Sequence, residues 1–458
     1  MGEGLEIILL AAASGVLFWA MAVVTEFRFV PTLVVLSDRM GIPKDVAGAT
    51  LMAAGASSPE LFSNMVSIFV TKSDLGIGTI IGSEIFNHMM ILAGVCASRD
   101  GPQRLDRLTT IRDNCAYGAS LALLLGAVCD VRRHGYADDD DRDDNSKVVV
   151  HAWSPLPLLG LYAAYVYLCS ESGRSLLARL CGGGAVAAAD GGPASTKAKA
   201  VDEEAAVVAL LYKGQGDDGA PVALASYGAA AVEEGIVAAH AEETAVFVVP
   251  RLASATPAGV VRFAADVVLA PAAFVIDATL FHPTNETSVC GLGANIAACA
   301  TWLVGFSYGM VVALERIGAL LHISSAVMGL TVAAVGTSFP NLVSSMVAAR
   351  DGHANMAVSN ALGSNTFNLC ICLGLPWFIY PFVYGEPYEA LHDYSVVFDT
   401  SLLAVVLLVY VAVLVAYDYT LHAPMGYVFA VSWLVFLVAS IVAGRNIDVI
   451  ENRIQGGH

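Results

Sequence analysis

Two short segments combine a proline with oxygen-bearing side chains inside long apolar stretches. The first reads Gly-Ala-Ser-Ser-Pro-Glu-Leu over residues 55–61, and the second reads Gly-Thr-Ser-Phe-Pro-Asn-Leu over residues 336–342. A proline inside a helix removes a backbone donor, so a carbonyl one turn earlier is left free. Free carbonyls, together with hydroxyl, amide and carboxylate oxygens, suit hard cations such as calcium and sodium. Each segment therefore predicts a helix break that lines a cation site.

A second pair of segments adds further oxygens. Residues 82–87 read Gly-Ser-Glu-Ile-Phe-Asn, and residues 363–368 read Gly-Ser-Asn-Thr-Phe-Asn. Small residues and hydroxyls also mark ordinary helix packing, which explains any single one of them. Carboxylates such as those of Glu60 and Glu84 are costly inside a membrane span and are usually functional. The candidate metal-binding residues are Ser57, Glu60, Ser83, Glu84, Asn87, Thr337, Ser338, Asn341, Ser364 and Asn368.

The two pairs of segments belong to one internal repeat. A shift of 281 residues aligns 48–92 with 329–373 without a gap, and fifteen of the 45 positions are identical. Five predicted membrane crossings separate equivalent points of the two copies, so the copies run in opposite directions. Inverted repeats of this kind are typical of secondary transporters, whose substrate site lies near the midplane between the copies.

The composition requires a membrane to hold these elements. The chain has 458 residues, of which 57% are hydrophobic and 14% are charged, whereas a soluble domain has about a quarter charged residues. One span needs about 20 mostly apolar residues. Ten predicted spans lie near residues 5–25, 46–70, 75–97, 115–130, 149–169, 290–314, 324–348, 356–383, 396–416 and 425–443.

We therefore predict an all-α membrane protein with ten transmembrane helices, arranged as two inverted five-helix repeats around a long central loop. The repeats are expected at 1–169 and 290–458. The loop at 98–114 carries arginines that place it on the cytoplasmic side by the positive-inside rule. The loop at 170–289 then lies in the cytoplasm as well, and it is largely of low complexity. Within it, residues 260–276 are apolar enough for a helix along the membrane interface.

The charges and cysteines exclude several classes of function. Much of the net charge of −18 comes from an acidic run at 138–144 and from scattered acids between 190 and 245. Neither a nucleic-acid footprint nor a basic lipid-binding cluster is present. The nine cysteines have no zinc-like spacing, so we interpret those in the spans as small buried hydrophobes. We expect membrane lipid and transported ions as partners, with no nucleic acid and no cofactor.

These motifs resemble the sodium/calcium exchanger superfamily, and most closely its potassium-dependent sodium/calcium exchanger branch. The similarity is carried by segments 29–33, 45–62 and 78–87 in the first half, and by 356–365 and Gly-Leu-Pro-Trp at 374–377 in the second. It covers both five-span halves and is weak across 170–259. The resemblance implies a ten-helix fold that alternates access to one midplane site and exchanges sodium against calcium.

The resemblance also implies ligand roles. Glu60 is similar to the first-repeat carboxylate that binds calcium and sodium, and Asn87 to its paired amide. The flanking oxygen ligands are implied to be Ser57, Ser83, Thr337, Ser338 and Ser364. The sequence departs from the family pattern at Asn341 and Asn368, where acids are expected, and at Glu84, where a small residue is usual.

These departures bear on which ion is carried. Glu60 alone suits a monovalent or weakly bound divalent ion, whereas Glu60 and Glu84 together can balance calcium. Glu84 lies three residues before Asn87, near the same helix face, so we expect it to point inward. Two neighbouring carboxylates can also share a proton, which would permit proton coupling. Asn368 argues against potassium dependence.

Three functions remain open. The first is a secondary active antiporter, not an enzyme, that exchanges calcium against sodium by alternating access. The second is a cation/proton or monovalent-cation exchanger with altered coupling. The third is a transport-dead homologue with another membrane role, which the hydroxyls and amides kept in both copies disfavour. For an integral multi-pass protein of this kind we expect the plasma membrane rather than an intracellular one.

Overall fold

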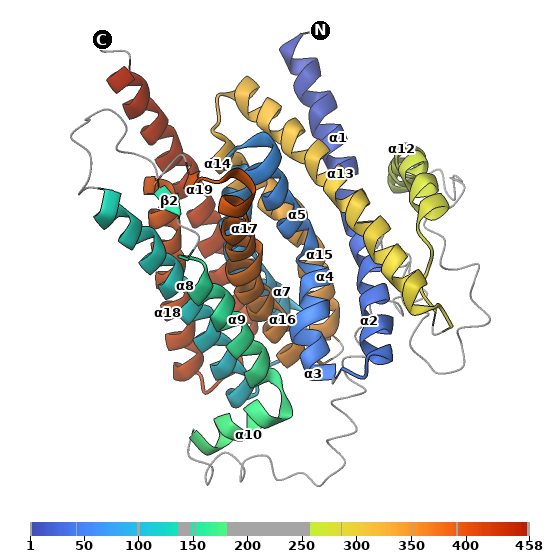
Figure 1. Cartoon of the computed structure of the whole chain (residues 1–458), viewed down its shortest axis with the longest axis vertical. Helices are drawn as coiled ribbons and strands as arrows, with labels where there is room; N and C mark the ends of the chain where they lie inside the picture. The colour runs from blue at the N-terminus through green and yellow to red at the C-terminus, as the bar shows by residue number, and fades with distance from the viewer. Residues whose placement is uncertain are drawn as a thin grey trace.

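The computed structural model describes residues 2–42, 44–98, 101–135, 148–150, 153–180, 257–284, 286–350, 352–390 and 393–455. These residues form a bundle of helices (Figure 1). Two small antiparallel sheets join loops at its ends: β1 (Gln103–Arg104) pairs with β4 (Thr420–Leu421), and β2 (Val148–Val150) with β3 (Tyr388–Ala390). The acidic run at 138–144 and most of the central loop lie outside the described residues.

Within the described ranges, seven helical segments are long and apolar enough to cross a membrane. The chain is therefore an all-helical membrane protein. The other three predicted spans correspond to helices that are shorter, interrupted or more polar. The seven segments are Glu3–Arg39, Leu75–Ala97, Val289–Leu321, Ser325–Arg350, Ala354–Tyr384, Phe398–Ala416 and Ala423–Val442.

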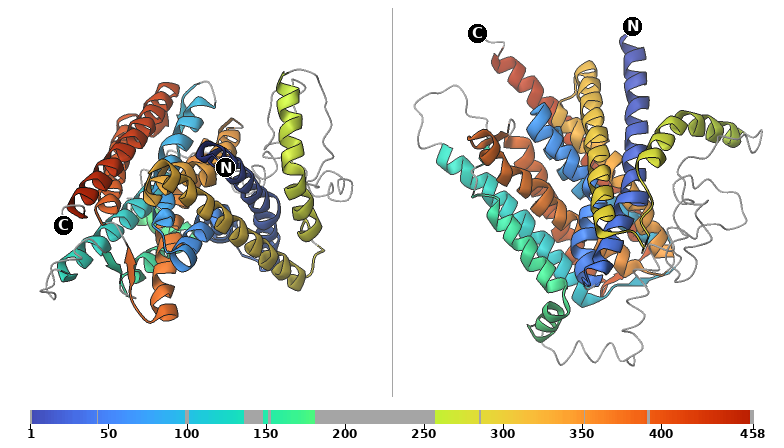
Figure 2. Two further views of the ribbon diagram at one scale, coloured as in Figure 1. Left: turned by 90° about the horizontal axis from the view of Figure 1, so that it is seen from above. Right: turned by 45° about the vertical axis from the view of Figure 1, so that its right-hand side comes forward.

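The first helix is longer than predicted. Helix α1 (Glu3–Val24) continues through the π-helical turn η1 (Thr25–Phe29) into α2 (Val30–Arg39). The predicted end at residue 25 was wrong because Arg28 is neutralised inside the fold, where its Nη2 lies 2.6 Å from Asp277 Oδ1. Asp277 belongs to α12 (Pro257–Thr279), which confirms a helix over 260–276. In Figure 2 this helix lies at the edge of the bundle.

The helices that carry the repeat are built from short α-helical pieces joined by π-helical turns. A π turn adds one residue to a helical turn and re-aims the side chains that follow, and such turns are frequent at functional sites. The first-copy elements are α3 (Lys44–Ala47), η2 (Gly48–Met52), α4 (Ala53–Ala56), α5 (Ser58–Val66), η3 (Ser67–Thr71), α6 (Leu75–Phe86), η4 (Asn87–Ile91) and α7 (Leu92–Ala97). The second-copy elements are α14 (Ser325–Met328), η5 (Gly329–Ala333), α15 (Ala334–Arg350), α16 (Ala354–Phe367), η6 (Asn368–Leu373) and α17 (Gly374–Tyr384).

Helices outside the repeat surround these elements. They are α8 (Arg107–Gly135), α9 (Leu156–Cys169), α10 (Glu171–Leu180), α13 (Val289–Leu321), α18 (Asp393–Ala416) and α19 (Ala423–Gln455). The predicted span at 115–130 was too short, because α8 already begins at Arg107. Of the charges before residue 115, Arg107 pairs with Asp418 at the surface, whereas Arg112 and Asp113 are paired inside the protein.

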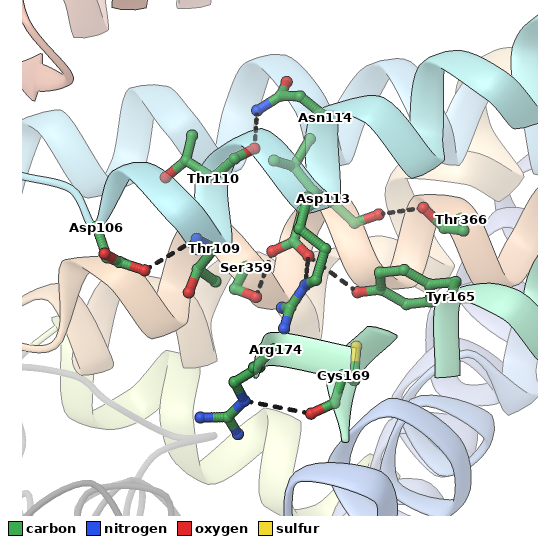
Figure 3. A network of polar contacts seen from close by, with 12 residues as sticks. Asp106, Thr109, Thr110, Asp113, Asn114, Tyr165, Cys169, Arg174, Ser359 and Thr366 are labelled. Carbon is green, nitrogen blue, oxygen red and sulfur yellow. Dashed lines mark hydrogen bonds and ion pairs between the residues drawn. The ribbon is translucent and has the colours of Figure 1, made fainter. Parts of the chain in front are cut away.

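That pairing centres on Asp113, a buried carboxylate in α8 (Figure 3). It accepts hydrogen bonds from Arg112 Nε at 2.8 Å, from Ser359 Oγ at 2.6 Å and from Tyr165 Oη at 3.3 Å. Ser359 lies in α16 and Tyr165 in α9. A buried charge requires partners of this kind, and here they connect α8 to two neighbouring helices.

The two copies meet along α6, every residue of which is buried. Gly78 of α6 lies against the carbonyl oxygen of Ala326 in α14, so closely that a Cβ there would collide with it. Gly329 of η5 lies in the same way against the carbonyl oxygen of Leu75. Only residues without a side chain permit such backbone-to-backbone contact. The two contacts are reciprocal, and they hold the candidate ligands of both copies together.

Candidate functional site

The first copy contains a helix break beside Glu60. Ser57 has φ −93° and ψ 12°, which separates α4 from α5. This conformation lies in the sparsely allowed bridge region, where functional residues are often found. Pro59 follows in the first turn of α5, where its missing N–H leaves no helical partner unpaired.

The second copy differs at this point. Pro340 lies inside the continuous helix α15, so the break predicted there was wrong. Neighbouring helices and hydroxyl side chains can satisfy the backbone groups that a membrane-embedded proline frees. The carbonyl that Pro340 frees is that of Gly336, four residues earlier, whereas the Thr337 hydroxyl beside it donates to the Ala333 carbonyl at 3.1 Å.

Glu60 joins the two copies. Ser338 Oγ donates a hydrogen bond to Glu60 Oε1 at 3.1 Å, and both side chains are fully buried. Nearby, Ser83 Oγ and Thr337 Oγ1 lie 3.4 Å apart, again with one residue from each copy. Four of the predicted site residues are therefore paired across the boundary between the copies.

Glu84 is fully buried and faces the interior of the bundle. Its side chain lies beside Asn368 and Tyr117, and within electrostatic range of Glu60. Its backbone carbonyl accepts a hydrogen bond from Asn365 Nδ2 at 3.0 Å. The carboxylate at position 84 thus stands next to the amide at position 368, although the two residues belong to different copies.

The site concentrates buried polar atoms that have no hydrogen-bond partner among the described residues. Buried polar groups normally have partners, and leaving one unsatisfied costs about 1–3 kcal/mol. Amide groups can turn to present oxygen instead of nitrogen, so these atoms fit a bound cation. They are Ser57 Oγ, Glu60 Oε2, Glu84 Oε1 and Oε2, Asn87 Oδ1 and Nδ2, Asn341 Nδ2 and Asn368 Nδ2.

The donor set is that of a hard-cation site. Within the described part of the chain, no group of three or more His, Cys, Asp or Glu side chains could hold a metal ion. Two carboxylates and a surround of hydroxyl and amide oxygens are present instead, including Ser364, which is buried in α16. Such a set suits calcium or sodium better than a transition metal.

The sequence did not point to three residues of this region. Asn64 Nδ2 donates to the Cys372 carbonyl at 2.8 Å, as Asn365 does to the Glu84 carbonyl, so one amide from each copy braces the other copy. Asn365 could have been found, since it is the repeat counterpart of Glu84. Tyr117 lies in α8, outside the repeat, and nothing in the sequence marked it.

The residues from 10 to 170 and from 293 to 442 match the family model described as sodium/calcium exchanger protein. These two ranges cover more than half of the chain and include both copies of the repeat. The chain belongs to the sodium/calcium exchanger family. The exchanger therefore carries out cation exchange transport as a multi-pass membrane protein, and its family consists of transporters rather than enzymes.

Curated relatives of the exchanger are sodium/potassium/calcium exchangers. It is 26% identical to human sodium/potassium/calcium exchanger 3 over 95% of its own length and 80% of the relative. It is 29% identical to human sodium/potassium/calcium exchanger 5 over 79% of its length and 68% of that relative. Among solved structures it is similar to an H⁺/Ca²⁺ exchanger, with a TM-score of 0.48, 12% identity and 99% coverage of both chains.

Proposed function

We propose that this exchanger moves calcium against sodium by alternating access to one site between residues 48–92 and 329–373. The observation that carries the proposal is the contact between Glu60 and Ser338 across the two copies. A ligand set shared by two opposed elements can be opened to one side of the membrane by moving one element against the other.

The charge of the site supports a divalent ion. Glu60 and Glu84 are both fully buried and within electrostatic range of each other. Two ionised carboxylates in such a site repel each other, and a bound calcium ion relieves that repulsion. Sodium ions can take the place of the calcium ion. The proposed ligands are Ser57, Glu60, Ser83, Glu84, Asn87, Thr337, Ser338, Asn341, Ser364 and Asn368.

We also propose the ten-helix inverted-repeat plan, with repeats at 1–169 and 290–458 and a cytoplasmic loop at 170–289. The fifteen identical positions that align 48–92 with 329–373 without a gap support two related copies. The start of α1 and the end of α19 lie at the same end of the bundle, as an even number of crossings requires (Figure 1). The proposed location is the plasma membrane.

Proton coupling is the second candidate function, and one observation favours it. Both carboxylates lie in the same buried site, and two such groups can hold one proton between them when no cation is bound. Potassium coupling has less support, because position 368 carries an amide. The negative charge in this part of the site is instead that of the neighbouring Glu84.

Transport by the purified full-length exchanger in liposomes tests these alternatives. Calcium, sodium, potassium and proton gradients are imposed one at a time, and calcium uptake is followed. We expect uptake driven by an outward sodium gradient, at a rate that potassium does not change. Uptake that requires a pH gradient would instead establish proton coupling, and absence of flux with every ion would overturn transport at this site.

A further inference from the structure

The thiol of Cys372 lies between the two copies at the proposed ion site. Cys372 belongs to η6 and is fully buried. Its Sγ lies 3.4 Å from Asn368 Oδ1 and 3.8 Å from the Ser57 backbone carbonyl oxygen, and its single proton can be donated to either acceptor. The sulfur therefore contacts a candidate ligand from each copy.

The position of this sulfur is held by its own backbone. The Cys372 carbonyl accepts the hydrogen bond from Asn64 Nδ2 at 2.8 Å, which ties η6 to α5. Around the sulfur, Ser57 Oγ and Asn368 Nδ2 are buried without a hydrogen-bond partner among the described residues. Both acids of the site, Glu60 and Glu84, are within electrostatic range of the thiol. The sulfur thus stands among groups that are free to bind a cation.

Sulfur changes which cations such a site accepts. Oxygen ligands suit calcium and sodium, whereas thiolate ligands select softer metals such as zinc. We propose that Cys372 is a ligand that lets thiophilic divalent cations, of which cadmium is the sharpest probe, bind at the exchange site. The proposal rests on the proposed function only in taking this site as the transport site.

Binding of cadmium exchanges one bond for another. The S–H bond of Cys372 breaks, its proton leaves to water along the ion path, and a sulfur–cadmium bond forms. The hydrogen bond that the thiol donates is lost at the same time. Asn368 Oδ1 and the Ser57 carbonyl oxygen are then free to join the metal.

Inhibition of calcium uptake by graded cadmium tests the proposal in liposomes. Wild type is compared with Cys372→Ser and with two controls, each measured against its own uninhibited rate. Cys370→Ser alters a buried thiol of the same π turn, and Cys299→Ser alters a fully buried thiol in the apolar cluster between α1 and α13.

We expect Cys372→Ser to raise the half-inhibitory cadmium concentration by about tenfold or more, which is the range for losing an interaction at a metal site. In both controls the half-inhibitory cadmium concentration should stay within about twofold of wild type, which corresponds to less than about 0.5 kcal/mol of binding free energy. A potency in Cys372→Ser that equals wild type, or a comparable shift in Cys370→Ser, would overturn the assignment.

Direct binding separates this proposal from the proposed function. Cadmium is titrated into the purified full-length protein, and the sulfur-to-cadmium charge-transfer absorption is recorded with and without excess calcium. Wild type should show a fraction of this absorption that calcium suppresses, and Cys372→Ser should lack it. Absence of a calcium-sensitive fraction in wild type would overturn the thiol site. If the fraction is present but sodium-driven calcium uptake is absent, the thiol site is supported and sodium/calcium exchange is contradicted.

Discussion

The two copies of the repeat, residues 48–92 and 329–373, share a third of their residues but differ in charge and in backbone. The first copy carries both acids, Glu60 and Glu84, whereas the second carries Asn341 and Asn365 at the equivalent positions. The first copy also breaks at Ser57, while the second runs unbroken through its proline. Duplicated elements have thus become unequal partners in one site.

The comparison indicates that the charged groups and the neutral oxygen-bearing groups of one site can come from different copies. In the proposed site, the acids of the first copy attract the cation, and the amides and hydroxyls of the second copy complete its ligand shell. Asn368 of the second copy lies beside Glu84 of the first. The negative charge that position 368 lacks is therefore present at position 84, its neighbour in space. We therefore expect substitutions of the first-copy acids to have larger effects than substitutions of the second-copy polar groups.

The largest effect is expected for Glu60→Gln, which keeps the shape of the side chain and removes its charge. Two unit charges about 4 Å apart attract by about 4 kcal/mol at an effective dielectric constant of 20. We expect calcium affinity to fall by more than about a hundredfold, measured as the calcium dependence of uptake. Glu6→Gln is the matched control, because the exposed pair between Glu6 and Arg316 contributes little. Equal effects of the two substitutions would contradict the comparison.

The next effect tests whether Glu84 and Asn368 are interchangeable carriers of one charge. Glu84→Ala should lower calcium affinity by about tenfold to a hundredfold, since it removes one of two compensating charges. Adding Asn368→Asp should recover most of that loss, because the new carboxylate stands next to the one removed. Calcium-dependent uptake of both variants gives the answer. A double variant no better than Glu84→Ala would show that the two positions do not share a role.

A smaller effect is expected in the second copy. Ser338→Ala removes the hydrogen bond to Glu60, and hydrogen bonds to charged groups contribute about 1.5–3 kcal/mol. We expect a decrease in calcium affinity of about tenfold, measured as above. Ser344→Ala in the same helix is the control, since its hydroxyl donates to a backbone carbonyl within that helix, that of Asn341 at 3.1 Å. If Ser344→Ala had the larger effect on calcium affinity, the hydrogen bond between Ser338 and Glu60 would not contribute to ion binding as proposed.

The smallest effect on ion affinity is expected at Asp113, outside both copies. Asp113→Asn leaves Arg112 without its buried charge partner, and breaking such pairs costs about 3–5 kcal/mol of stability. Thermal unfolding in detergent should therefore occur at a lower temperature, while calcium affinity stays within about twofold, or about 0.4 kcal/mol. A changed ion preference with unchanged thermal stability would place Asp113 in the ion site. It would contradict the proposal that the ion is bound only by residues of the two copies.

The sequence predicted the elements whose signals are local. The repeat, its four motifs and the apolar helices were readable because each depends on residue type and spacing. The end of the first helix was not, because Arg28 is neutralised by a residue 249 positions away. The start of α8 was missed for the same reason, since Ser359 and Tyr165 pair with Asp113 only in the folded protein.

The site shows the same division between local and distant information. Inward orientation of Glu84 followed from its spacing to Asn87 on one helix. The contacts of Tyr117 and Cys372 did not, because they depend on how α8 and η6 pack. Continuity through Pro340 was also missed, because a membrane-embedded helix can contain a proline when its surroundings satisfy the freed backbone groups, and residue type alone does not reveal those surroundings.

We propose that the negative charge that balances a divalent ion resides on the two acids of the first copy, Glu60 and Glu84. The most direct measurement compares sodium-driven calcium uptake with sodium self-exchange for Glu84→Gln and wild type, at matched amounts of protein in liposomes. We predict that Glu84→Gln strongly reduces calcium uptake and keeps sodium self-exchange, because Glu60 alone still suits a monovalent ion. Unchanged calcium uptake in Glu84→Gln would contradict it.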